Sequence, residues 1–238
     1  MLGIIPGYYN SATGVVAAVL PSEHFYLQYG FFDGNLANGV QTGMGGPHFN
    51  GHYFHIGEVG ANWLLGKDEL SGQFGIGYWG QTGPLTTLGG TTTLGAQGCY
   101  LFGSQRLYWE SPGENHNGLG GYYQFGTTNN DIVFTQRFFG CGLTYYGPLP
   151  RRNNDTAGFA MGLGRMTNDP QAAKAFFSGY GPGPAPLGNS ETILTWYYQI
   201  ELRPGMYLQP NLTYIPDPAR VPNTPGAFPF TIQGVMLF

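Results

Sequence analysis

Apolar and polar residues alternate with period two along most of this sequence. From Leu194 to Leu202 every second residue is apolar or aromatic, and Thr195 and Gln199 lie among the residues between them. This period is typical of a β-strand whose two faces meet different surroundings. Each run is about ten residues long, the length of a tilted strand that crosses a bilayer.

The connections between these runs also follow a pattern. Short turns alternate with long loops, and the tight turn after Thr128 is the exception. Short turns at one end and long loops at the other are typical of an outer-membrane β-barrel, so the predicted fold is all-β, an antiparallel transmembrane barrel. A helix is predicted inside the loop 167–190, with Asp169 as its cap and Pro170 in its first turn. The eleven predicted strands are 12–20, 23–32, 51–64, 71–80, 94–109, 117–127, 131–147, 155–166, 191–202, 206–216 and 229–238, and the long loops are 33–50, 81–93, 167–190 and 217–228.

Low charge agrees with a wall that faces lipid. Charged residues make up 9% of the 238 residues, against about 25% in soluble domains. A net charge of −4 offers no basic patch, so no nucleic acid partner is expected. A soluble secreted glycan-binding β-sandwich and an outer-membrane hydrolase stay as alternatives. No motif places a nucleophile and a base at a usable spacing, so enzyme activity is not expected.

No disulfide, metal or cofactor is expected. Cys99 and Cys141 lie in strands separated by one strand, which puts their backbones roughly 10 Å apart, beyond the reach of a disulfide. They are therefore predicted to be free thiols. Residues 75–80 match G-x-G-x-x-G, but no helix follows to complete a dinucleotide site. His52 and His55 point to opposite faces of a strand, which prevents them from sharing a zinc ion.

Two stretches in the C-terminal half resemble a known family. Residues 138–155 (FFGCGLTYYGPLPRRNND) contain a Gly-rich strand, a GPLPR turn and an Asp that opens the next strand. Residues 191–218 (ETILTWYYQIELRPGMYLQPNLTYIPDP) contain a closing hairpin, and the chain ends on Phe238. These features resemble the carbohydrate-selective porins of the OprB type, specifically over 116–238 and more weakly over 1–115. In the turn, Arg151 and Arg152 are either solvated or paired with Asp155.

The resemblance implies a monomeric barrel of about sixteen strands, within the range of outer-membrane barrels, that passes glucose and similar sugars into Gram-negative bacteria. Eleven predicted strands and no visible signal peptide then lead us to expect that residues 1–238 are the C-terminal portion of a single porin barrel, with no second domain. An open sheet leaves two unpaired edges in lipid, so we expect that this chain alone makes no working pore. Phe238 resembles the signal that the outer-membrane assembly machinery recognises.

A sugar pathway needs hydrogen-bonding side chains in the lumen, because sugars are neutral and carry many hydroxyl groups. Lipid excludes charged side chains, which assigns the strand charges to the lumen, and strand parity adds further polar residues. The alternative is that these charges pair with each other and only stiffen the wall. The parity of Arg106 is ambiguous. The expected partners are permeating monosaccharides and outer-membrane lipid, and the predicted lumen residues are Glu58, Arg137, Glu191, Tyr197, Gln199, Glu201, Gln209 and Asn211.

Overall fold

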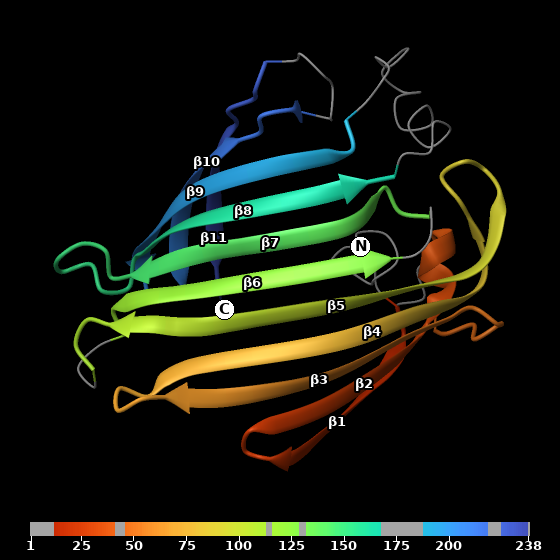
Figure 1. Cartoon of the computed structure of the whole chain (residues 1–238), viewed down its shortest axis with the longest axis horizontal. Helices are drawn as coiled ribbons and strands as arrows, with labels where there is room; N and C mark the ends of the chain where they lie inside the picture. The colour runs from red at the N-terminus through yellow and green to blue at the C-terminus, as the bar shows by residue number, and fades with distance from the viewer. Residues whose placement is uncertain are drawn as a thin grey trace.

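Eleven strands form one antiparallel sheet in which each strand is hydrogen-bonded to the next one in the chain (Figure 1). The structure is a computed structural model that describes residues 12–40, 46–112, 116–128, 132–167, 188–218 and 225–237. The strands are β1 (Gly14–Ser22), β2 (Phe25–Asp33), β3 (Tyr53–Leu65), β4 (Leu70–Thr86), β5 (Thr92–Trp109), β6 (Gly118–Thr128), β7 (Thr135–Tyr146), β8 (Thr156–Met166), β9 (Ser190–Arg203), β10 (Met206–Tyr214) and β11 (Phe230–Met236).

All eleven predicted strands are confirmed, but one predicted long loop is wrong. Strand β4 continues to Thr86 and β5 begins at Thr92, so most of 81–93 belongs to a long hairpin. The register shifts between Gln81 and Pro84, where Gly83 has a φ of +87°. This β-bulge lets the ladder continue past a proline that cannot donate a hydrogen bond. The helix predicted at 170–177 and Phe238 lie outside the described residues.

The short turns gather at one end of the sheet and the longer connections at the other (Figure 1). Gly66 and Gly205 supply left-handed backbone in two of the short turns, with φ of +71° and +81°. Strands β1 and β11 run in the same direction, and in the described sheet each pairs with one neighbour. No helix among the described residues is both long and apolar enough to cross a membrane.

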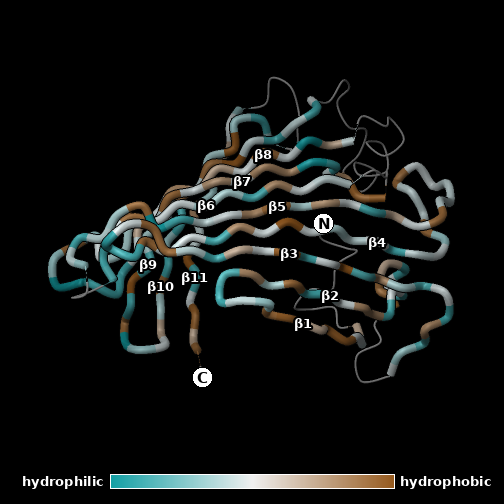
Figure 2. Tube along the Cα trace, turned by 60° about the horizontal axis from the view of Figure 1, so that its bottom comes forward, coloured by the Kyte–Doolittle hydropathy of each residue, from teal (hydrophilic) through white to brown (hydrophobic). Residues whose placement is uncertain are grey.

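The register separates the two faces of the sheet into one apolar and one polar surface. Leu27, Val59 and Ile76 are cross-strand partners on the apolar face, and each exposes more than 45% of its surface. The next row along the strands contains Gln28 and Glu58, which therefore lie on the polar face. Figure 2 shows the resulting alternation of hydrophilic and hydrophobic residues along the strands.

A small hydrophobic core lies on the polar face at the long-loop end. Phe54, Trp79, Leu85 and Ala96 are buried there. The 3-10 helix η1 (Gly34–Asn38) contacts β3 and β4 beside this core. The loop segment is held by the buried Asp33 carboxylate, which accepts hydrogen bonds from the backbone N–H groups of residues 35, 48 and 49. Residues 34–38 and 48–49 of the connection after β2 are therefore held close to the sheet.

Glycines make room for aromatic rings that cross from the neighbouring strand. A Cβ atom added to Gly77 on β4 would lie 2.2 Å from the Tyr100 ring, which comes from β5. The same relation holds between Gly60 and Tyr26 and between Gly158 and Tyr197. Several of the many glycines and aromatic residues are thus paired across neighbouring strands, because each ring occupies the space that a side chain at the glycine position would fill.

We predict that Gly77→Ala destabilises the protein by about 1–3 kcal/mol, the usual cost of overpacking, because the new methyl group displaces the Tyr100 ring. Urea unfolding in detergent micelles measures the change. The matched control is Gly57→Ala on the adjacent strand, where the nearest atom to an added Cβ is 3.7 Å away. Equal losses in the two variants would contradict the role given to Gly77.

Candidate functional site

The sheet places all but one of the predicted lumen residues on its polar face. Glu58 and Glu191 stand in one cross-strand row with Gly77, Tyr100 and other residues between them. The alternation along β9 then brings Tyr197, Gln199 and Glu201 to this face. On β10, Gln209 and Asn211 lie opposite residues of β9 and share the same side.

Arg137 is the exception, and the prediction that it shares the face of Glu58 is wrong. It pairs with Thr127 on β6 and Arg165 on β8, in a row that continues through Cys99 and Tyr78 on the opposite face. The register of β7 shifts between Thr135 and Arg137, at the long-loop end of the strand. A long arginine near a strand end can extend toward water, so charge alone did not decide its face.

Glu58 is the centre of a buried hydrogen-bond cluster. Its carboxylate accepts hydrogen bonds from Tyr26 Oη at 2.8 Å, Gln28 Nε2 at 2.9 Å and Tyr100 Oη at 2.7 Å, and only 9% of the residue is exposed. Tyr100 reaches Glu58 from two strands away across Gly77. Three donors for one carboxylate satisfy the buried charge and hold β2, β3 and β5 in register.

Sequence reasoning did not select the three partners of Glu58. Tyr26 and Gln28 alternate with apolar residues on their strand, so the period-two pattern already placed them on the polar face. Tyr100 could not be found in this way, because its contact with Glu58 depends on the registers of two hairpins.

A second cluster of neutral polar groups covers the C-terminal part of the polar face. The hydroxyl groups of Thr144 and Tyr197 lie 2.8 Å apart. The Gln209 amide donates to Asn211 Oδ1 at 2.8 Å and accepts from Gln199 Nε2 at 3.4 Å. These hydroxyl and amide groups both donate and accept hydrogen bonds, which is the chemistry that pairs with sugar hydroxyl groups.

A cavity of about 690 Å³ opens on the polar face between the two clusters. Its lining combines the aromatic residues Tyr100, Phe102 and Phe138 with the polar side chains of Gln124 and Glu191. The Tyr100 and Phe102 rings are nearly parallel, with an angle of 12° between their planes. Aromatic surface beside a few polar groups is the usual composition of a small-molecule site.

The ambiguous Arg106 also lies on the polar face. It pairs with Gly120 in the row that leads to Thr144 and Tyr197. Its guanidinium group lies 4.0 Å from the Trp109 ring centre and 4.2 Å from that of Tyr146. Two cation–π contacts fix this charge near the short-turn end.

Asp155 ties the GPLPR turn to strand β9. Its buried carboxylate accepts two hydrogen bonds from Arg152, both at 2.7 Å, one from Tyr198 Oη at 2.7 Å and one from the Glu201 N–H at 2.9 Å. Burial alone would raise the pKa of this carboxyl group, but these donors together lower it below its ordinary value. The pairing of Arg152 with Asp155 is thus the correct alternative of the two considered for this turn.

The two cysteines are free, as predicted, and lie on different cross-strand rows. Within the described ranges no group of three or more His, Cys, Asp or Glu side chains could hold a metal ion. The arrangement on the polar face therefore offers hydrogen bonding and aromatic contact as its chemistry.

Comparison with known protein families shows to which family this chain belongs. The family model for the carbohydrate-selective porin, OprB family, matches residues 2–231. The chain belongs to this family. Comparison with curated protein sequences gives no match. The single described sheet also excludes the β-sandwich alternative, which needs two packed sheets.

Two solved structures of Pseudomonas putida OprB have a similar fold. The high-pH structure gives a TM-score of 0.75 at 18% identity, covering 98% of this chain and 60% of that chain. The low-pH structure gives a TM-score of 0.55 at 18% identity, covering 93% and 52%. This OprB-family chain therefore spans about 60% of the length of the high-pH structure that it matches.

We predict that Tyr100→Phe lowers the free energy of unfolding by about 1.5–3 kcal/mol, the usual value of a hydrogen bond to a charged group. The variant keeps the ring over Gly77 and removes only the donor to Glu58. Urea unfolding measures the loss. The control is Tyr29→Phe, since the Tyr29 hydroxyl makes no hydrogen bond among the described residues; an equal loss there would contradict the prediction.

We predict that Asp155→Asn lowers the melting temperature at neutral pH and has no effect in strong acid. The lowered pKa means that the ionised carboxylate stabilises the fold above the ordinary Asp pKa of about 3.9. This contribution disappears as the pH falls through the lowered value, so wild type and variant converge there. Thermal unfolding between pH 2 and pH 7 measures the difference, with Asp68→Asn in the exposed β3–β4 turn as control. A difference that is constant across this range would contradict the assignment.

Proposed function

We propose that this chain forms the wall of an outer-membrane channel through which neutral, glucose-like sugars diffuse. The observation that carries the proposal is the shared polar face, where Glu58, Tyr197, Gln199 and Gln209 lie on one side of a continuous sheet. The groups there are mainly hydroxyls and amides, which can replace the water around a sugar without requiring it to be charged.

The opposite face supports a lipid environment. Large apolar side chains such as Val59, Leu143 and Trp196 expose 43–48% of their surface there. An apolar surface that extends across so many strands is rare on soluble monomers. We place this face against the acyl chains of the outer membrane. We also propose that the assembly machinery recognises the aromatic residue Phe238.

Closure of the channel requires partners for both edges of the sheet. The backbone N–H and C=O groups along the outer edges of β1 and β11 have no strand beside them in the described sheet. Unpaired backbone groups are costly in hydrocarbon. The proposal therefore concerns a barrel in which further strands complete both edges, and the chain refolded alone into planar bilayers should give no discrete sugar-permeable conductance.

We predict that a chimera in which this chain replaces the matched part of Pseudomonas putida OprB takes up labelled glucose into liposomes. The double variant Gln199→Leu with Gln209→Leu should lower the initial uptake rate roughly threefold to tenfold, since each lost hydrogen bond contributes about 0.5–1.5 kcal/mol. Recovery of the chimera in the detergent-soluble outer-membrane fraction confirms its location.

The matched control is Leu212→Gln, which changes a side chain on the apolar face of β10. It should alter folding yield but not the uptake rate per folded channel. A folded chimera that excludes glucose, or one whose uptake does not respond to the Gln199 and Gln209 variants, would contradict the proposed pathway.

A further inference from the structure

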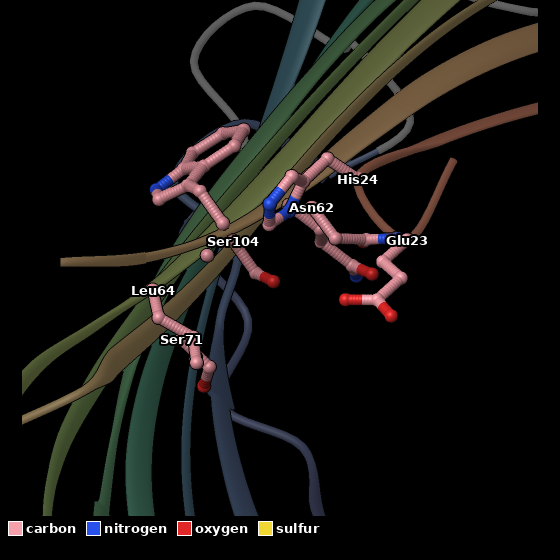
Figure 3. A pocket seen from close by; sticks show the side chains of 9 residues that line it. Glu23, His24, Asn62, Leu64, Ser71 and Ser104 are labelled. Atoms are coloured by element: carbon pink, nitrogen blue, oxygen red, sulfur yellow. The ribbon is translucent and has the colours of Figure 1, made fainter. Parts of the chain in front are cut away.

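A separate pocket of about 500 Å³ lies at the short-turn end of the polar face. It is bounded by the β1–β2 turn and by strands β3, β4 and β5 (Figure 3). The residues that carry the following argument are His24 from the turn, Asn62 from β3, Gln73 from β4 and Ser104 from β5. None of them belongs to the clusters around Glu58 or Gln209.

The register places three of these side chains in one row. Asn62 pairs with Gln73, and Gln73 pairs with Ser104, so they occupy neighbouring strands on the same face. His24 is held beside Asn62, because its carbonyl oxygen accepts the Asn62 N–H at 2.8 Å. Figure 3 shows the His24 and Asn62 side chains next to each other at the pocket.

These polar side chains differ from their neighbours in having no internal partner. In the part of the chain that the structure describes, Asn62, Gln73 and Ser104 make no side-chain hydrogen bond. Nearby Gln105 on the other face, in contrast, accepts from the Trp63 indole N–H at 2.8 Å and donates to a backbone carbonyl at 2.9 Å. The row in the pocket is therefore free to bind a molecule that enters it.

We propose that this row is a binding site for a neutral sugar. This proposal rests on the proposed function and adds a defined sugar-binding position near the short-turn end of the channel. Two amides and a hydroxyl group supply both donors and acceptors, and the Glu23 carboxylate, which also lines the pocket, adds acceptors for sugar hydroxyl groups. Because neighbouring strands lie about 4.8 Å apart, the three groups extend over roughly 10 Å, which suits the hydroxyl groups around one or two sugar rings.

The next residue in the row is a tyrosine outside the pocket lining. Tyr122 on β6 pairs with Ser104, and its ring lies over Gly142, where an added Cβ would be 2.6 Å away. The residue exposes 40% of its surface. The ring thus extends from β6 toward β7 and away from Ser104, so the polar row itself supplies the contacts with a sugar. The pocket volume also falls within the range of about 300–1,000 Å³ for small-molecule sites.

The test follows the side-chain amide signals of the full chain, labelled with ¹⁵N and folded in detergent micelles, while glucose is added. The Asn62 and Gln73 signals should shift and saturate, and Ser104→Ala should weaken the glucose affinity roughly threefold to tenfold, the effect of one lost hydrogen bond. The matched control is Ser190→Ala, an exposed serine that pairs with Arg165 on the opposite face.

The outcomes separate this site from the proposed pathway. In one outcome glucose shifts the amide signals of Gln199 and Gln209 in a saturable manner but leaves those of Asn62 and Gln73 unchanged. In that case the proposed binding site is wrong and the proposed function stands. If no amide on the polar face responds, the site is wrong, and the proposed function is decided separately by glucose uptake through the chimera. Shifts at Asn62 and Gln73 that grow linearly without saturation, or equal effects of Ser104→Ala and Ser190→Ala, also overturn the site.

Discussion

The continuous antiparallel hydrogen-bond ladder is the constraint on which the other features depend. In lipid every backbone N–H and C=O group must find a partner, and a sheet provides partners only between strands. The ladder from β1 to β11 thereby locks the parity of each strand to that of its neighbours. A slip of one residue would exchange Val59 with Glu58 and move a carboxylate onto the lipid-facing surface.

The same ladder explains the pairing of glycines with aromatic rings. Neighbouring strands lie so close that a large ring can cross a strand only where that strand has no side chain. Gly77 provides this opening for Tyr100, which then reaches Glu58 on the strand beyond. A polar network can thus extend over three strands without a break in the ladder, and the buried charge gains its donors from residues distant in sequence.

Hydrogen bonding divides the polar face into a fixed wall and groups that remain free. The Glu58 carboxylate and the Asp155 turn are saturated with internal donors, and their role is to hold strands and turns together. The amides of Gln199 and Gln209 are partly paired with each other. Asn62 and Gln73 at the short-turn end, by contrast, make no side-chain hydrogen bond among the described residues. This division gives a physical basis for assigning structural and binding roles on one surface.

The period-two pattern was sufficient to predict the strands, the two faces and the polar side of residues such as Gln199 and Asn211. It succeeded because each strand is long and its two faces meet chemically different surroundings. The polarity of its side chains therefore alternates from one residue to the next. The family resemblance, based on residues 138–155 and 191–218, led to the porin class.

Only the tertiary structure decided features that depend on register between strands. Arg137 lies on the apolar face in regular alternation with Phe139, against the expectation from its charge, and the bulge at Gln81 lets β4 and β5 extend into a predicted loop. The contact of Tyr100 with Glu58 and the alignment of Asn62 with Gln73 required two or more hairpins to be in place. Side-chain alternation is a local property that the sequence contains, whereas register is set by bulges, turns and packing across the whole sheet.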